Sequence, residues 1–192
     1  MLLNLSFPSI NLKRALYIIF TVILLDQISK FYIKLNFPLT LYGDDAILDY
    51  GFFKLLFIEN KGMAWGTKLS DFIPFLDDEI SKLLLTMIRI VAIVFLGYWI
   101  KKSLKDKASN SLMLSLCLIF AGAIGNLLDS IFYGVIFSHS YGQVSTFLPD
   151  EGYAPFFFGH VVDMLSLIHI SEPTRLLSIW YSVVFLIKKM GG

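Results

Sequence analysis

Apolar residues occur in long continuous runs along this chain, and the length of the runs predicts helices that cross a membrane. Three runs, at about residues 15–35, 83–100 and 112–136, approach the roughly 20 residues that a bilayer-spanning helix needs. Between the first two runs, residues 36–82 alternate short apolar pieces with prolines, glycines and aspartates. This composition predicts a subdomain on the water side of the membrane rather than another span.

A further apolar run, at about residues 176–187, is shorter than the others. Its length corresponds to about 18 Å of helix, whereas the hydrocarbon core of a bilayer is roughly 30 Å thick. It could be lengthened only through residues 171–175, where Pro173 would interrupt a helix. We therefore expect a degraded fourth span.

Within the water-side subdomain, residues 52–58 are aromatic and aliphatic and predict a short strand. Gly62 and Gly66 follow where the chain would begin its return, so we expect a small antiparallel sheet. The turn from Glu59 to Gly66 combines an amide side chain with two glycines, which allow close approach of the backbone to another chain or a ligand. An ordinary hairpin turn explains the same residues, and both interpretations stay open.

The composition places residues 1–192 in a single integral membrane domain. Hydrophobic residues make up 56% of the chain, charged residues only 16%, and the mean hydropathy of +0.71 is too high for an ordinary soluble domain. The net charge of +1 argues against a nucleic-acid partner, because phosphate binding needs a basic excess on one face. The single cysteine, Cys117, excludes a disulfide within the chain.

Basic residues cluster at three places, and these clusters predict the topology. They are residues 13–14, 101–107 and 188–189. By the positive-inside rule, four spans with both termini in the cytoplasm place all three clusters inside and residues 36–82 outside. The first cluster and the apolar run after it look like the start of a signal peptide, but no cleavage site with small residues follows, so we expect an uncleaved span.

Polar side chains inside the first two spans are the first candidates for chemistry. Asp26 and Lys30 lie four residues apart, on one face of a helix, where an acidic residue before a basic one forms a favourable pair. The pair either neutralises itself at the membrane interface or faces a polar cavity within the bundle. Arg89 is expected to have a structural role, extending from the second span toward the headgroups.

The third span carries Gly122, Gly125, Asn126 and Asp129, which share one helical face. Small residues there allow close helix packing, and Asn126 can donate or accept a hydrogen bond across the interface. Packing alone would explain the glycines. A carboxylate within a span, however, indicates that Asp129 faces the bundle interior or a wet cavity.

Asp163 stands in an apolar run where the chain approaches its last span, and such a carboxylate needs a partner or a function. Two carboxylates that share a proton can drive the attack of water on an amide: the charged one activates the water, and the neutral one donates to the carbonyl oxygen. This chemistry needs no metal or cofactor, and His139 and His160 have no metal-site spacing. The chain contains no G-x-S-x-G, H-E-x-x-H or phosphate loop to suggest another route.

Four motifs follow one another along about residues 13–165. They are Asp26-Gln27-Ile28-Ser29-Lys30, Asn60-Lys61-Gly62-Met63-Ala64-Trp65-Gly66, Gly122-Ala123-Ile124-Gly125-Asn126-Leu127-Leu128-Asp129 and Val161-Val162-Asp163. Together they resemble lipoprotein signal peptidase, the bacterial signal peptidase II family. The resemblance implies a membrane α-helical fold of four transmembrane helices, with a small extracytoplasmic β-rich subdomain between helices 1 and 2. It implies an aspartic endopeptidase of the inner membrane.

By the same resemblance, the enzyme works near the periplasmic face and removes signal peptides from prolipoproteins that carry a diacylglyceryl cysteine. It would be inhibited by globomycin-type compounds and act as a monomer among membrane lipids. Asp163 matches the first catalytic aspartate. Further positions would bind substrate or support the site: Asp26, Lys30, Asn60, Gly62, Gly122, Asn126 and Asp129.

The chain departs from the family pattern in two respects. Ser130 stands where the family often has arginine, and no aspartate follows Asp163, although the second catalytic aspartate belongs to an Asn-x-Ala-Asp motif before the last span. Glu172 is the only later carboxylate, and its context does not match that motif. Residues 165–175 look like a translated sequencing adapter, which would mean that the true C-terminal part is missing. Because the second catalytic aspartate is absent, we expect an inactive or poorly active enzyme.

Two other functions remain open from the sequence. The chain could be a non-enzymatic membrane protein that holds a lipidated partner through the outer subdomain. It could also be a small transporter whose aspartates relay protons, although the sequence has no inverted repeat or paired broken helices.

Overall fold

The computed structural model describes residues 10–39, 46–49, 54–61 and 77–166 of the chain. The chain divides into two compact units, residues 1–39 with 57–163, and residues 40–56 with 164–192. Three described helices are long and apolar enough to cross a membrane. By length and composition they correspond to three of the predicted spans, whereas the fourth, at 176–187, lies outside the described residues.

Helix α1, Leu12–Asn36, begins where the side chain of Asn11 accepts a hydrogen bond from the backbone N–H of Arg14 at 3.0 Å. It ends just before Pro38, because the residue that precedes a proline is biased away from helical backbone angles. The helix is longer at both ends than the predicted span. Its last two turns carry Lys30 and Lys34, two buried lysines.

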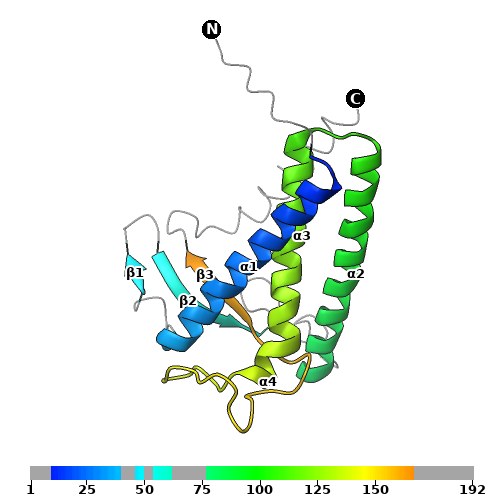
Figure 1. Cartoon of the computed structure of the whole chain (residues 1–192). Helices are drawn as coiled ribbons and strands as arrows, with labels where there is room; N and C mark the ends of the chain where they lie inside the picture. Colours follow the sequence, from blue (N-terminus) through cyan, green and yellow to red (C-terminus); the bar gives the residue numbers. More distant parts are fainter. Residues whose placement is uncertain (1–9, 40–45, 50–53, 62–76, 167–192) are drawn as a thin grey trace. The chain divides into compact units, whose positions relative to one another are not determined.

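Helices α2, Asp78–Lys105, and α3, Asn110–Leu128, form an antiparallel hairpin (Figure 1). The hydroxyl of Ser109 caps the start of α3. Helix α3 packs against both α1 and α2. The core between these three helices consists of Ala15, Ile19, Ile100, Met113, Leu116, Cys117 and Ala121.

The third span continues beyond α3 through a π-helical turn, η3 (Asp129–Tyr133), into the short helix α4 (Gly134–Ile136). A π-helical turn inserts an extra residue and alters the direction of nearby side chains; such turns are frequent at functional sites. Here it begins at Asp129. The sequence predicted the span but not this local change of helix type.

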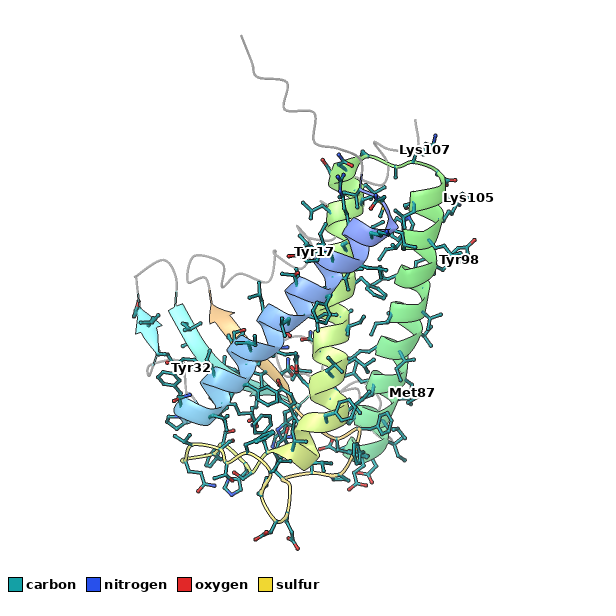
Figure 2. All side chains as sticks on the ribbon, viewed as in Figure 1. Tyr17, Tyr32, Met87, Tyr98, Lys105 and Lys107 are labelled. Carbon is teal, nitrogen blue, oxygen red and sulfur yellow. The ribbon has the colours of Figure 1, made fainter. Side chains whose placement is uncertain are left out.

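Apolar side chains cover the outside of the helices, as expected for a surface in contact with lipid. Tyr17, Tyr32, Met87 and Tyr98 all project outward from the ribbon (Figure 2) and are exposed. A helix that is apolar on all sides is typical of a membrane span. The basic segment expected as a loop at 101–107 is mostly helical, because α2 continues to Lys105 and, of its lysines, only Lys107 follows the helix; Lys105 and Lys107 lie at this end of α2 (Figure 2).

The strands are β1 (Leu48–Asp49), β2 (Lys54–Asn60) and β3 (Val161–Ser166), in the order β1-β2-β3. β1 pairs antiparallel with β2, and Leu48 lies opposite Leu55. This pairing confirms a small antiparallel sheet, although the partner strand precedes β2; the return expected after Gly62 lies outside the described residues. The predicted strand at 52–58 corresponds to β2, displaced by two residues.

Strand β3 gives the run before Asp163 a local structure that the sequence did not specify. Val161 and Val162 are buried residues of a sheet strand, and the last span expected beyond them lies outside the described residues. Both residues are β-branched, and β-branched residues favour strands. Apolarity alone cannot distinguish a short buried strand from the start of a helix.

Candidate functional site

A buried lysine on α1 is the centre of a polar cluster among the helices. Lys30 Nζ lies 2.9 Å from Asp26 Oδ2 and 2.7 Å from Asp129 Oδ2, and it donates to Asn126 Oδ1 at 3.3 Å. Gln27 completes the group, which we call the Lys30 cluster: Asp26, Gln27, Lys30, Asn126 and Asp129. The Lys30 side chain is 3% exposed and that of Asp26 is 27% exposed, so Lys30 faces the interior of the helices while Asp26 is partly exposed.

Gln27 connects the two carboxylates of this cluster. Its Nε2 donates to Asp26 Oδ2 and to Asp129 Oδ1, both at 3.0 Å, while its Oε1 accepts from the hydroxyl of Tyr133 at 3.0 Å. Sequence reasoning did not assign Gln27 or Tyr133 to the site. The adjacency of Gln27 to Asp26 was the available signal, because an amide can donate to two carboxylates at once.

A glycine on α3 makes room for this arrangement. A Cβ atom at Gly125 would overlap the carboxylate of Asp26, so a larger residue would displace that side chain from its place against α3. A Cβ at Gly122 would meet nothing within 4 Å among the described residues. The predicted close packing therefore holds for Gly125 and not for Gly122.

The π-helical turn directs three buried side chains inward: Asp129, Ser130 and Tyr133. Arg89 of α2 donates through Nη1 to Ser130 Oγ at 2.7 Å, and Ser130 Oγ donates to the carbonyl of Asn126 at 3.0 Å. Arg89 was expected to have a structural role. Its guanidinium contacts the residue that stands where the family pattern often has arginine.

Asp163 lies on β3 with its side chain exposed to solvent. Its Oδ2 accepts a hydrogen bond from Asn60 Nδ2 of β2 at 3.3 Å. The neighbouring backbone N–H, of Val162, donates to Asp129 Oδ2 at 3.2 Å in a buried position. Asp129 thus connects the Lys30 cluster to the strand that presents Asp163.

The loop before β3 also packs tightly against the π-helical turn. The N–H of Gly159 donates to the carbonyl of Ser130 at 2.9 Å, and a Cβ at Gly159 would overlap the carbonyl oxygen of Asp129. Glycine is therefore required by this close approach.

Partial burial raises the pKa of Asp163 above its usual value of 3.8. The hydrogen bond from Asn60 and the positive charges of Lys30 and Arg89 act in the opposite direction. Because its pKa is raised, the protonated form of Asp163 is more accessible than that of an ordinary surface aspartate, and proton exchange with a partner requires this form.

A second charged group, which the sequence analysis did not identify, centres on Glu59 of β2. Glu59 Oε1 accepts hydrogen bonds from Lys34 Nζ and, at 2.7 Å, from Ser140 Oγ; Glu59 Oε2 lies 3.0 Å from His160 Nδ1. Ser145 Oγ lies 2.7 Å from Ser140 Oγ. These five residues are called the Glu59 cluster below.

Burial acts to raise the pKa of Glu59, but hydrogen bonds and charges from His160, Lys34 and Ser140 outweigh it and lower the pKa to about 2. Burial also lowers the pKa of His160. At neutral pH the pair is therefore a carboxylate and a neutral imidazole. Because a carboxylate only accepts hydrogen bonds, the imidazole carries its proton on Nδ1.

The structure brings most of the predicted site residues together in two places. Asp26, Lys30, Asn126 and Asp129 form one cluster, and Asn60 pairs with Asp163. Gly62 lies outside the described residues. Within the described ranges, no second carboxylate forms a hydrogen bond with Asp163, and no group of three or more His, Cys, Asp or Glu residues could hold a metal ion.

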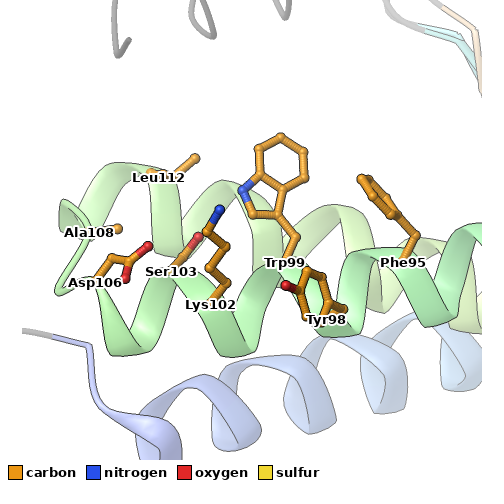
Figure 3. A pocket seen from close by; sticks show the side chains of 8 residues that line it. All are labelled: Phe95, Tyr98, Trp99, Lys102, Ser103, Asp106, Ala108 and Leu112. Atoms are coloured by element: carbon orange, nitrogen blue, oxygen red, sulfur yellow. The ribbon is translucent and has the colours of Figure 1, made fainter.

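A pocket of about 420 Å³ lies at the α2–α3 connection (Figure 3). Trp99 and Phe95 line it on one side and Asp106 and Leu112 on the other. None of the predicted site residues is among the side chains that line it. The candidate site is therefore separate from this pocket.

Apolar spans that surround a buried cluster of lysine, carboxylates and amides, next to an exposed aspartate, define an α-helical membrane protein with a carboxylate-based polar site. The chain belongs to the signal peptidase (SPase) II family, whose model matches residues 18–187. Its family and its three apolar helices identify a bacterial membrane protein.

Curated relatives named lipoprotein signal peptidase include one from Porphyromonas gingivalis (strain ATCC 33277), 40% identical over 149 residues. This match covers 77% of the chain and 60% of the relative. The relative from Amoebophilus asiaticus (strain 5a2) is 33% identical over 145 residues, which is 74% of the chain and 54% of the relative. The chain thus spans about 60% or less of the length of these relatives.

One solved structure is similar in fold, with a TM-score of 0.54 and 20% identity. The alignment covers 95% of this chain and 92% of that chain, and the structure is titled "Bacterial membrane enzyme structure by the in meso method at 2.3 A resolution". At this identity the likeness supports the fold only.

Proposed function

We propose that this chain is built to remove signal peptides from bacterial prolipoproteins, with Asp163 as a reacting carboxylate. The observation that carries the proposal is the placement of Asp163: an exposed carboxylate that receives a hydrogen bond from Asn60 and stands beside a buried cluster of charges. Exposure gives access to water and substrate. The buried cluster fixes the backbone on which the carboxylate stands.

In the proposed reaction, two carboxylates share one proton. The charged carboxylate takes a proton from the attacking water, and the protonated one donates to the carbonyl oxygen of the scissile amide. Asp163 supplies one of these groups, and Asn60 holds it in orientation through its amide. Lys30 and Arg89 favour the charged form of Asp163 through their positive charges.

The second carboxylate of the family pattern has no equivalent aspartate after Asp163 within the 192 residues. General acid–base catalysis typically contributes about 10²- to 10⁴-fold to a rate. We therefore expect this chain to bind its substrate but to cleave it slower by about that factor than an enzyme with both carboxylates.

The proposed substrate is a prolipoprotein with a diacylglyceryl-modified cysteine, and its support is the name lipoprotein signal peptidase shared by the relatives. We further propose four spans, the last at about 176–187, with both termini in the cytoplasm. Residues 36–82 would then lie on the outer side of the inner membrane, close to the lipid part of the substrate. Globomycin-type compounds are the proposed inhibitors, and a monomer is the proposed state.

The test is cleavage of a diacylglyceryl prolipoprotein by the purified chain in proteoliposomes. We expect slow cleavage by the chain, and we expect Asp163→Asn to abolish it. The control Asp150→Asn changes an exposed loop aspartate and should leave the cleavage rate unaltered. Cleavage at a normal rate by both the chain and Asp163→Asn would contradict the proposal.

The absence of an aspartate after Asp163 favours one alternative, a membrane protein that binds a lipidated partner without cleaving it. This alternative predicts binding of the diacylglyceryl prolipoprotein with no product formed even after long incubation. It also predicts that Asp163→Asn leaves the affinity unchanged. Slow product formation that depends on Asp163 would exclude it.

A further inference from the structure

The Glu59 cluster has no part in the reaction proposed above, yet it is one of the most extensively hydrogen-bonded groups among the described residues. Lys34 has no exposed surface, and Ser140 and Ser145 are also buried. Charged groups are costly to bury unless they are paired and hydrogen-bonded. The position of this cluster relative to Asp163 suggests what its role is.

The cluster joins three separate parts of the chain at a single carboxylate. Lys34 belongs to the last turns of α1, Ser140 to the loop after α4, and His160 to the segment that leads into β3. Each donates to Glu59. The carboxylate therefore fixes the end of β2 to these three segments.

Aromatic contacts reinforce this anchoring. The ring of Tyr153 lies 4.8 Å from the His160 ring, and the Tyr153 hydroxyl accepts from the backbone N–H of His160 at 2.7 Å. Lys34 Nζ lies 5.1 Å from the centroid of the Tyr153 ring and 5.2 Å from that of Phe137. Such cation–π contacts add to the stabilisation of a desolvated ammonium group.

Both residues of the Asn60–Asp163 hydrogen bond adjoin this cluster in sequence. Asn60 follows Glu59 directly on β2, and Asp163 lies three residues after His160. Successive side chains of a strand point to opposite faces, so anchoring Glu59 on one face fixes the direction of Asn60 on the other. The 3.3 Å hydrogen bond to Asp163 thus depends on where Glu59 holds the strand end.

We propose that Glu59 is a positioning residue, which holds Asn60 in hydrogen-bonding contact with Asp163 by tying the end of β2 to α1, to the loop after α4 and to the start of β3. The inference rests on the proposed function in treating Asp163 as a reacting group. Its test, however, requires no turnover.

The test measures the apparent pKa of Asp163 from the ¹³C shift of its carboxyl group in the full chain, labelled at aspartate and held in detergent micelles or nanodiscs. Asn60→Ala should raise this pKa by about one pH unit, because a hydrogen bond to the charged form is lost. Glu59→Gln should raise it by at least about half as much in the presence of Asn60. In the Asn60→Ala background, Glu59→Gln should add no further increase.

The sign of the change separates positioning from a direct charge effect. Removing a nearby negative charge makes it easier to ionise Asp163 and lowers its pKa, whereas loss of the Asn60 hydrogen bond raises it. Glu151→Gln, a change of an exposed glutamate in a loop, is the matched control and should leave the Asp163 pKa unchanged.

Glu59→Gln leaves the Lys34 ammonium buried without its carboxylate, which could prevent folding. The double variant Lys34→Met/Glu59→Gln removes both charges, and the same rise in the Asp163 pKa is expected from it. An unchanged or lowered Asp163 pKa in the folded variants, or an equal rise with and without Asn60, would overturn the positioning role. If Glu59 and Asn60 stay coupled in their effect on the Asp163 pKa but cleavage does not depend on Asp163, only the proposed function is contradicted.

Discussion

Helix α1 contributes a buried lysine to each of two charged clusters, and the two clusters differ in their balance of charge. The Lys30 cluster sets two carboxylates, Asp26 and Asp129, around one lysine. The Glu59 cluster sets one carboxylate between Lys34 and His160. With ordinary charges, the first carries an excess negative charge, whereas the second is balanced when its histidine is neutral.

This difference indicates a division of roles. The balanced Glu59 cluster satisfies its own charges and serves to anchor backbone segments. The Lys30 cluster contacts the strand of Asp163 through the backbone N–H of Val162. Its electrostatic state therefore bears directly on the candidate reacting group.

Replacement of Lys30 should have the largest effect on stability and would test the role of the cation in the Lys30 cluster. Lys30→Met leaves Asp26 and Asp129 in the interior without their shared cation, and removal of one partner from a buried ion pair costs about 3–5 kcal/mol. We expect a loss of that size in the free energy of unfolding, measured by denaturant titration in detergent.

The control is Lys13→Met at an exposed lysine near the start of α1, which should change the free energy of unfolding by less than about 0.5 kcal/mol. Equal stability of Lys30→Met and the wild type would show that the Lys30 cluster does not need its cation.

A fall in pH should lower the free energy of unfolding mainly through the Glu59 cluster. The pKa of Glu59 is lowered from 4.5 to about 2 in the folded protein, so the unfolded chain binds more protons between these values. The resulting stabilisation is complete above about pH 4.5 and is lost as the pH falls toward about 2, by about 3 kcal/mol in total.

Protonation of His160 also destabilises the folded protein, at a higher pH than protonation of Glu59. Burial lowers its pKa below 6.5, so the folded state loses stability as the pH falls below that value. Denaturant unfolding as a function of pH should therefore show two acid steps, and Glu59→Gln should remove the lower one. Retention of the lower step in Glu59→Gln would assign it to another group.

The sequence could predict most of the Lys30 cluster, apart from Gln27, because its members come from two helices with regular periodicity. Asp26 and Lys30 share a face of one helix, and Gly125, Asn126 and Asp129 share a face of another. Local spacing identified the two faces, and the family resemblance assigned them to one site. The π-helical turn at Asp129 could not be predicted, since it follows from tertiary contacts rather than from propensity.

The Glu59 cluster could not be predicted, because no local pattern connects its members. Glu59 and His160 are 101 residues apart, and Lys34 and Ser140 are 106 residues apart. Only the pairing of strands and the path of the loop after α4 bring them together. The same reason explains why the sequence did not predict strand β3, whose neighbour β2 is about 100 residues away.

A subtler test concerns the glycines of α3. Gly125→Ala places a methyl group against the Asp26 carboxylate, and overpacking of a buried contact costs about 1–3 kcal/mol. Gly122→Ala meets nothing within 4 Å among the described residues and replaces a glycine within a helix. It should therefore leave stability unchanged or raise it by up to about 1 kcal/mol. Thermal unfolding in detergent would compare the two, and equal destabilisation of both variants would contradict the contact between α1 and α3.

The smallest expected effect is at Ser130, where the hydroxyl receives a hydrogen bond from Arg89 and gives one to the carbonyl of Asn126. Ser130→Ala removes both and should cost about 1–2 kcal/mol, because Arg89 retains other interactions. Ser111→Ala, an exposed serine in the first turn of α3, is the matched control and should be neutral within about 0.5 kcal/mol. Arg89 also favours the charged form of Asp163, so a shift of Arg89 after loss of its hydrogen bond to Ser130 should raise the Asp163 pKa. A variant that loses stability while that pKa stays constant would show that Ser130 supports only the helix packing and does not hold the cation near the candidate reacting group.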